Sequence, residues 1–259
     1  MQDLTIGLIQ TSIEWHNPEA NRYSITKKIH KLDKKADLLV LPEMFTTGFT
    51  MEVENNSEAP NGITVDWMKE LATSTGAVIT GSIIIEENKK YYNRLYWVKP
   101  NGELTYYNKR HLFRMAHEEK HFTDGNDQVI VEVNGWKIKP LICYDLRFPV
   151  WSRNNNLAYD LLLYVANWPQ PRISAWDALL KARAIENISY SVGVNRIGKD
   201  GTNKIYNGHS ACYDYKGELL NELNEKNEII LLTLSKSDLI DYRDKFPAHL
   251  DADSFHISK

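Results

Sequence analysis

Residues 139–149 read Lys-Pro-Leu-Ile-Cys-Tyr-Asp-Leu-Arg-Phe-Pro, an apolar run that stops on Cys143. Such a run is typical of a buried strand, and a strand that ends on a cysteine presents a nucleophile at the rim of its sheet. Two other apolar runs end on polar side chains, residues 37–43 on Glu43 and residues 160–167 on Asn167. Because the carboxyl ends of strands line the ligand crevice of an open α/β sheet, we expect these three side chains to meet.

A lysine in aromatic and apolar company completes the candidate set. Lys109 lies within Tyr-Tyr-Asn-Lys-Arg-His-Leu-Phe, residues 106–113. A cysteine amidase needs a nucleophilic thiol, a stabiliser for the developing oxyanion and an acid for the departing nitrogen. Glu43 could act as base, then acid, then base again, while the Lys109 ammonium and the backbone N–H of Tyr144 hold the oxyanion. The ammonium is also expected to lower the pKa of the Cys143 thiol.

Composition and charge exclude several classes of protein. The chain is 42% hydrophobic, and no Gly/Ser/Pro-rich linker or charge block divides it, which predicts one domain over residues 1–259 with a short polar tail from about residue 235. A formal charge of −3 with interspersed signs argues against a nucleic-acid partner. No stretch approaches the roughly 20 apolar residues of a membrane span, and no basic leader opens the sequence. Two cysteines make no disulfide framework, so we predict a cytoplasmic protein whose thiol stays reduced.

Strand-like and helix-like stretches alternate along the chain, which predicts an α/β fold with helices covering a sheet. Asn17 followed by a proline is typical of a helix N-cap. Ser174 with Asp177 resembles a capping box that opens a helix reaching about residue 187. Besides the three runs above, strands are predicted over residues 4–13, 77–86, 92–99, 104–108, 129–133, 189–196, 210–215 and 228–234.

Three segments, in order, resemble the nitrilase superfamily of carbon–nitrogen hydrolases. They are Leu-Pro-Glu-Met-Phe-Thr-Thr-Gly-Phe at 41–49, Tyr-Asn-Lys-Arg-His-Leu-Phe at 107–113 and Leu-Ile-Cys-Tyr-Asp-Leu-Arg-Phe-Pro at 141–149. Further matching segments at 164–169, 181–187 and 208–210 extend the resemblance over nearly the whole chain. The ordered trio is far more specific than any one of its motifs.

The resemblance implies both a fold and an activity. The fold is an αββα four-layer sandwich whose protomers pair into a homodimer with eight layers. The chain looks most similar to the omega-amidases, which hydrolyse the distal amide of 2-oxoglutaramate or 2-oxosuccinamate to the 2-oxo dicarboxylate and ammonia. By the motifs, Glu43 matches the general base, Lys109 the third catalytic member and Cys143 the nucleophile. No metal or organic cofactor is implied.

Many members of the superfamily carry a second active-site glutamate after the lysine. Here residues 114–122 offer Glu118 and Glu119, and we favour Glu118. An anionic keto acid also needs a cationic contact. Candidate substrate-binding residues are Tyr144, Phe45, Arg114, Trp168 and Arg172. Arg147, in contrast, is expected to pair with a carboxylate behind the nucleophile.

Several alternatives stay open from the sequence. The trio would serve equally for another superfamily hydrolase, such as a nitrilase, an N-carbamoyl amidase or an aliphatic amidase. His117 and His121, with His111 nearby, allow a zinc amidase, although the spacing lacks the His-Glu-x-x-His register. A scaffold without turnover is the third alternative. Because cysteines are often core residues, Cys212, which lies in an alternating strand, is assigned to the core.

Overall fold

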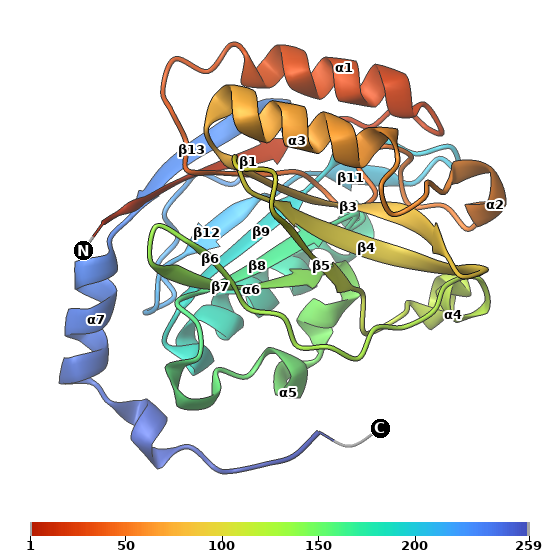
Figure 1. Ribbon diagram of the computed structural model, residues 1–259. Helices are drawn as coiled ribbons and strands as arrows, with labels where there is room; N and C mark the ends of the chain where they lie inside the picture. Colours follow the sequence, from red (N-terminus) through yellow and green to blue (C-terminus); the bar gives the residue numbers. More distant parts are fainter. Residues whose placement is uncertain (1, 258–259) are drawn as a thin grey trace.

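The computed structural model describes residues 2–257 and contains two β-sheets stacked face to face between helices (Figure 1). The first sheet has the strand order β13-β1-β2-β3-β4-β5. Its strands are β1 (Leu4–Gln10), β2 (Leu38–Val40), β3 (Val78–Glu87), β4 (Lys90–Val98), β5 (Leu104–Asn108) and β13 (Glu228–Leu234). The second sheet, β12-β9-β8-β7-β6, consists of β6 (Val131–Val133), β7 (Trp136–Ile142), β8 (Leu161–Ala166), β9 (Tyr190–Asn195) and β12 (Ala211–Tyr213).

The remaining elements surround these sheets. A separate hairpin is formed by β10 (Ile197–Lys199) and β11 (Ile205–Asn207). The α-helices are α1 (Pro18–Ile29), α2 (Val53–Asn56), α3 (Ile63–Thr75), α4 (Glu118–His121), α5 (Pro149–Ser152), α6 (Ile173–Asn187) and α7 (Lys236–Lys245). Helices α1 and α3 cover the outer face of the first sheet, and α5 and α6 lie beyond the second (Figure 1). The predicted αββα layering is confirmed.

Each sheet contains a parallel core. In the first, β2 pairs in parallel with β1 and β3, and in the second β8 pairs in parallel with β7 and β9. Strands β2, β7 and β8 therefore send the chain out in the directions that place Glu43, Cys143 and Asn167 just beyond their carboxyl ends. The predicted meeting of strand ends follows from this topology.

Apolar side chains form the layers of the core. Between the sheets, Leu8 and Val40 of the first belong to one buried cluster with Leu163 of the second. A second cluster joins α1 and α3 to the first sheet. On the other side, α6 approaches β9 so closely that a Cβ at Gly193 would lie 2.5 Å from the Trp176 ring, which explains the glycine there.

The predicted helix starts have different outcomes. Asn17 caps α1 as predicted, since its Oδ1 accepts from Ala20 N at 3.1 Å. The prediction of a capping box at Ser174 is wrong. A 3₁₀ turn leads directly into α6, which begins at Ile173, so Ser174 lies inside the first turn of the helix. Asp177 instead bonds through its carboxylate to His209 Nδ1 at 3.1 Å.

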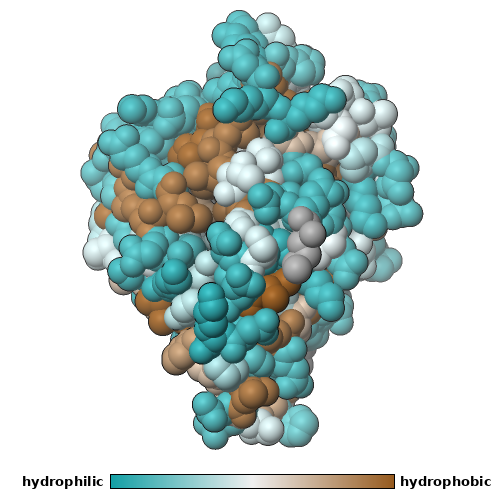
Figure 2. Space-filling model, turned by 90° about the vertical axis from the view of Figure 1, so that its left-hand side faces the viewer, coloured by the Kyte–Doolittle hydropathy of each residue, from teal (hydrophilic) through white to brown (hydrophobic). Residues whose placement is uncertain are grey.

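The predicted polar tail is tied to the body of the protein. Arg243 of α7 is buried and pairs with Asp160 at 3.0 Å, while its Nε donates to Ile188 O. Beside it, β13 forms the edge of the first sheet, with half-buried apolar side chains at 229–232. Figure 2 shows a patch of apolar side chains on this side of the molecule. Within residues 2–257, none of the helices combines the length and apolar character needed to cross a membrane.

Candidate active site

Glu43 is fully buried and its carboxylate is held by donors from both sheets. Asn93 Nδ2, on β4, donates to Oε1 at 2.8 Å, and the backbone N–H of Asn167 donates to Oε2 at 2.8 Å. The side-chain amide of Asn167 also donates, through Nδ2, to the backbone carbonyl oxygen of Glu43 at 2.5 Å. The next residue, Met44, has a φ of 43°, so the chain turns sharply just after the carboxylate. These contacts orient a buried acid or base at the junction of the two sheets.

Lys109 follows β5 and is fully enclosed between two carboxylates. Its Nζ donates to Glu43 Oε1 at 2.9 Å and to both oxygens of Glu118 at 3.0 Å. Burial by itself would lower the pKa of Lys109, but the Glu118 and Glu43 charges outweigh it and raise the pKa above its usual range. The amine is therefore a permanent ammonium, as the sequence predicted, and serves as an electrostatic clamp.

Glu118 opens the short helix α4 and points its carboxylate inward. The backbone N–H of Phe113 donates to its Oε2 at 2.6 Å, and His117 before it has a φ of 58°. Burial raises the pKa of Glu118, Lys109 lowers it and Glu43 raises it, with a net upward shift. Glu119 is only partly buried and lines a separate surface hollow. The structure thus brings Glu118 to the lysine and leaves Glu119 outside.

Cys143 begins a tight turn at the end of β7, with a φ of 44°. A non-glycine residue in this left-handed region costs about 1–2 kcal/mol, so the surroundings must hold it there. The buried Asp145 carboxylate does so by accepting from Ile142 N at 3.0 Å and from Tyr107 Oη at 2.8 Å. It also accepts from the backbone N–H of His111 at 3.0 Å.

The pKa of the Cys143 thiol is shifted upward by its surroundings. Burial raises its pKa well above the usual value, the Glu43 charge raises it further, and Lys109 only partly opposes them. Lys109 lowers the pKa of the thiol, as predicted, but burial and the Glu43 charge outweigh it, so the net shift is upward. A base must take the proton when the sulfur attacks, and the buried carboxylate of Glu43 is next to it.

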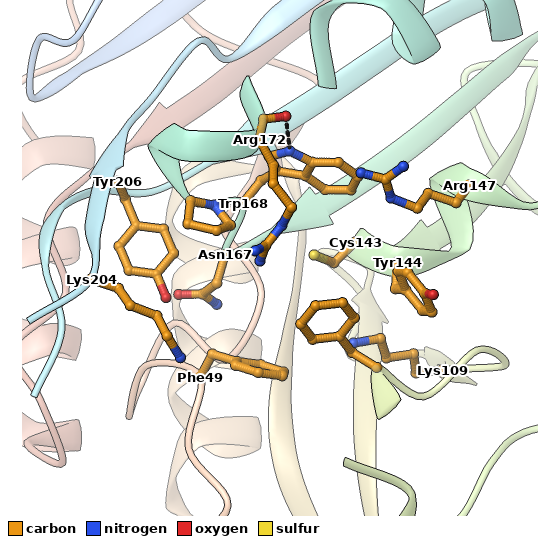
Figure 3. A pocket seen from close by; sticks show the side chains of 12 residues that line it. Phe49, Lys109, Cys143, Tyr144, Arg147, Asn167, Trp168, Arg172, Lys204 and Tyr206 are labelled. Atoms are coloured by element: carbon orange, nitrogen blue, oxygen red, sulfur yellow. Dashed lines mark hydrogen bonds between the residues drawn. The ribbon is translucent and has the colours of Figure 1, made fainter. Parts of the chain in front are cut away.

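A pocket opens over Cys143, and Figure 3 shows the side chains around it. Cys143, Tyr144 and Lys109 lie on one side of it, and Lys204 and Tyr206 lie on the other. The rest of the wall is formed by Phe49, Phe113, Arg147, Asn167, Trp168, Pro169 and Arg172. The pocket therefore combines an aromatic lining, a thiol and several cationic side chains, which suits a small electrophile with a negative charge.

The predicted binding residues divide into two groups. Tyr144, Trp168 and Arg172 line the pocket. Phe45 does not, because it is fully buried in the cluster between the first sheet and its helices, with its ring centre 5.7 Å from that of Trp67. Arg114 does not either, since it is exposed on the surface hollow that Glu119 also lines.

Arg147 departs from its prediction. Its guanidinium lies over the Trp168 ring, 5.1 Å from the ring centre, on the pocket wall. Among the residues that the structure describes, it makes no ion pair with a carboxylate. The carboxylate behind the nucleophile, Asp145, is occupied instead by backbone N–H groups, Tyr107 and His111.

Sequence reasoning overlooked Asn93, Phe49, Lys204 and Tyr206. Asn93 is an amide at the start of the buried part of β4, and a polar side chain at that position of a predicted strand was the available signal. Lys204 and Tyr206 lie in the β10–β11 hairpin, outside the matching segments, and carried no such signal. Cys212, in contrast, is fully buried in β12, as predicted.

The histidines proposed for zinc do not gather. His117 and His121 are both exposed and flank the short α4 helix. Within residues 2–257, no three His, Cys, Asp or Glu side chains are grouped so that they could hold a metal ion. The residues that do converge are those of a thiol hydrolase.

Comparison with known proteins agrees with this geometry. Residues 5–244 match the family described as carbon-nitrogen hydrolase. The omega-amidase YafV of Escherichia coli K12 is 46% identical over 258 residues, which cover 99% of this chain and 100% of that protein. The 2-oxoglutaramate amidase of Bacillus subtilis is 32% identical over 251 residues, covering 95% and 96% of the two chains.

A solved structure gives the same result for the fold. XC1258 from Xanthomonas campestris is a CN-hydrolase superfamily protein whose crystal structure holds an arsenic adduct in its active site. It superposes with a TM-score of 0.97 at 43% identity, over 100% of both chains. With the ordered motifs, the sandwich and the Glu–Lys–Cys pocket all in place, this chain belongs to the carbon–nitrogen hydrolase family, the nitrilase superfamily.

Proposed function

We propose that this carbon–nitrogen hydrolase is an omega-amidase that removes the distal amide of a 2-oxo dicarboxylic acid monoamide, such as 2-oxoglutaramate, and releases ammonia. The observation that carries the proposal is the Cys143 thiol on a pocket wall beside the buried Glu43–Lys109 pair. The full-length likeness to omega-amidase YafV and to 2-oxoglutaramate amidase supports the substrate class.

The first half of the reaction makes a thioester. Cys143 Sγ attacks the amide carbon while Glu43 takes the thiol proton. The oxyanion that forms is held by the Lys109 ammonium and the backbone N–H of Tyr144. Glu43 then delivers its proton to the amide nitrogen, the C–N bond breaks, and ammonia leaves.

The second half restores the enzyme. Water attacks the thioester carbon and gives a proton to Glu43, the same oxyanion contacts form, and the C–S bond breaks. The departing sulfur receives the proton from Glu43, which returns the neutral thiol. One carboxylate therefore serves as base, acid, base and acid in turn. Asn93 and Asn167 keep it oriented throughout, because they bond to it from opposite sheets.

Charge in the pocket favours an anionic substrate. The side chains of Arg147, Arg172 and Lys204 line it, and none of them pairs with a carboxylate within the described part of the chain. Arg172 lies over the Phe113 ring, 5.2 Å from its centre, and is oriented toward the pocket in Figure 3. We assign to Arg172 the carboxylate at the substrate end remote from the amide.

Two further parts of the proposal concern the oligomeric state of the protein and its location. We propose that two protomers pair through their α5–α6 layers, where Val150 and Ile185 expose large apolar side chains. Sedimentation analysis tests the pairing, since a protomer mass at micromolar concentration would contradict it.

A cytoplasmic location is proposed because a free thiol nucleophile needs reducing conditions.

Ammonia release across a panel of omega-amides, nitriles and N-carbamoyl amino acids tests the activity. The protein is expected to prefer the omega-amides, Cys143→Ala is expected to release no ammonia, and Cys212→Ala is expected to retain turnover if it folds. A preference for nitriles or carbamoyl compounds would reject the omega-amidase assignment. Undiminished turnover by Cys143→Ala would reject the mechanism.

A further inference from the structure

The β10–β11 hairpin forms part of the pocket wall and belongs to neither main sheet. The chain leaves β9 of the second sheet, and Ile197 N then donates to Thr11 O, just after β1 of the first, at 3.0 Å. The buried Arg196 guanidinium reinforces this seam by donating to Ile13 O and Lys199 O at 3.0 Å. The hairpin is therefore a fixed bridge between the sheets, placed over the pocket.

Two hairpin side chains reach the pocket. Lys204 and Tyr206 lie on the side of the pocket that faces Cys143 and Tyr144 (Figure 3). Lys204 is exposed, and its ammonium has no carboxylate partner among residues 2–257. It is thus a free cation at the end of the pocket away from the thiol.

A single buried carboxylate holds the Tyr206 side chain and the backbone at Lys204. Asp200 Oδ1 accepts from Lys204 N at 3.0 Å and from both the N–H and the hydroxyl of Thr202 at 2.8 Å. Its Oδ2 accepts from Tyr206 Oη at 2.9 Å. The Tyr206 ring is held from its other side by the Arg196 guanidinium, 4.8 Å from the ring centre. Asp200 thereby sets the conformation of the loop that carries the lysine.

We propose that the β10–β11 hairpin is the specificity element of this enzyme, in which Lys204 binds the carboxylate of the substrate together with Arg172 and Asp200 is a positioning residue. The inference rests on the proposed function and names how the substrate class is recognised. Substrate enters with its amide at Cys143 and its carboxylate toward the hairpin. Amides without that charge lose this contact and only fill the aromatic part of the pocket.

The test compares glutaramate, an anionic omega-amide, with pentanamide, which has the same chain length and no charge. For Lys204→Met, the ratio of kcat/KM for glutaramate to that for pentanamide is expected to fall by roughly three- to tenfold, mainly through KM for glutaramate. Lys204→Arg, which keeps the charge, is expected to keep most of the ratio. Lys199→Met, an exposed lysine on β10 outside the pocket, is the matched control and is expected to leave both values within about twofold.

Asp200→Asn keeps the size of the side chain but removes the charge and the acceptor for Tyr206. It is expected to raise KM for glutaramate and to leave kcat with either amide within about twofold. A general loss of kcat in this variant would instead indicate a structural role and overturn the positioning assignment. An unchanged ratio in Lys204→Met would overturn the specificity assignment alone. If the parent enzyme itself did not prefer glutaramate over pentanamide, the proposed function would fail first, so the two failures are distinguishable.

Discussion

Lys109 Nζ lies 3.0 Å from both carboxylate oxygens of Glu118 while it also bonds to Glu43. Glu118 thus shares the ammonium with Glu43, the proposed base. Without the second negative charge, Lys109 would bind the Glu43 carboxylate more tightly and make it a weaker base.

Glu118→Gln is therefore expected to lower kcat by about 10² with little change in KM, because proton transfer from the thiol becomes harder. Steady-state ammonia release measures it. Glu119→Gln, its neighbour on the outer surface, is the matched control and should keep parental kcat. A KM effect alone in Glu118→Gln would instead make Glu118 a substrate contact.

Glu43→Gln removes the base and one of the causes that raise the pKa of Cys143. At neutral pH we expect kcat to fall by about 10²–10⁴, the range typical of a lost general base. The residual rate is expected to climb as pH increases toward 9, because solvent then deprotonates a thiol whose pKa has dropped. A pH–rate profile from 6 to 9 measures it, with Cys143→Ala as the background. A variant that keeps the parental profile would exclude Glu43 as the base.

The left-handed conformation of Cys143 predicts an unusual order of stability. Glycine adopts a φ of 44° without strain, whereas alanine does not. The free energy of unfolding of Cys143→Gly is therefore expected to exceed that of Cys143→Ala by about 1 kcal/mol, so the glycine variant is the more stable one. Urea denaturation of the two inactive proteins measures the difference. The reverse order would mean that the turn relaxes once the sulfur is removed.

Asp145→Asn tests how this turn is held. The variant loses the charge that accepts from the backbone, from Tyr107 and from His111, so we expect a loss of about 1–3 kcal/mol in the free energy of unfolding. We also expect a lower kcat, because Cys143 is no longer fixed toward Glu43. Tyr107→Phe leaves the charge and the ring in place and removes only the hydroxyl, which donates to Asp145 and accepts from Arg110 N and Trp151 Nε1, so it should have a smaller effect on both. Equal effects would assign the role to the Tyr107 hydroxyl.

Lys139 predicts a pH dependence of stability. It is buried on β7, where its amine donates to Gln128 Oε1 at 2.9 Å and to Trp151 O at 2.6 Å, and burial lowers its pKa from 10.5 to about 8. Between pH 8 and 10.5 the unfolded chain binds the proton that the folded one has released, so this group adds stability as pH rises. Over this pH range, the free energy of unfolding of the parent should rise relative to that of Lys139→Met by an amount that approaches about 3 kcal/mol.

Denaturation of the parent and Lys139→Met at pH 7.5, 9 and 10 provides the measurement, since other titrating groups cancel in the difference. Lys137→Met, an exposed lysine on the same strand, is the control and should show no such trend. A difference that stays flat over this range would mean that the amine is neutral or solvated throughout.

Much of the site could be predicted because the reacting groups follow strand ends or ordered motifs. Glu43, Lys109 and Cys143 lie together as expected, and so does Asn167. Glu43, Cys143 and Asn167 meet through parallel pairing within each sheet and stacking of the two sheets, and Lys109 joins them from the end of the antiparallel strand β5. Such features follow from apolar runs and the residues that end them.

The remaining residues depend on geometry that sequence does not encode locally. Phe45 lies two residues after Glu43 but points into the core, because the turn at Met44 reverses the chain. Arg114 precedes Glu118 yet lies outside the pocket, because the chain also turns at His117, which has a positive φ like Met44. Lys204 reaches the site only because a hairpin is pinned across the seam between the sheets. Positive φ angles and long-range anchoring therefore mark the limit of what the sequence predicts here.

The catalytic groups are divided between the two halves of the sandwich. Glu43 and Lys109 extend from the first sheet, whereas Cys143 and Asn167 extend from the second. Turnover therefore depends on how the two sheets are aligned. A relative shift of about an ångström would separate the sulfur from the carboxylate without unfolding any strand. Mild denaturant or heat should silence the enzyme while its circular dichroism is still that of the native protein.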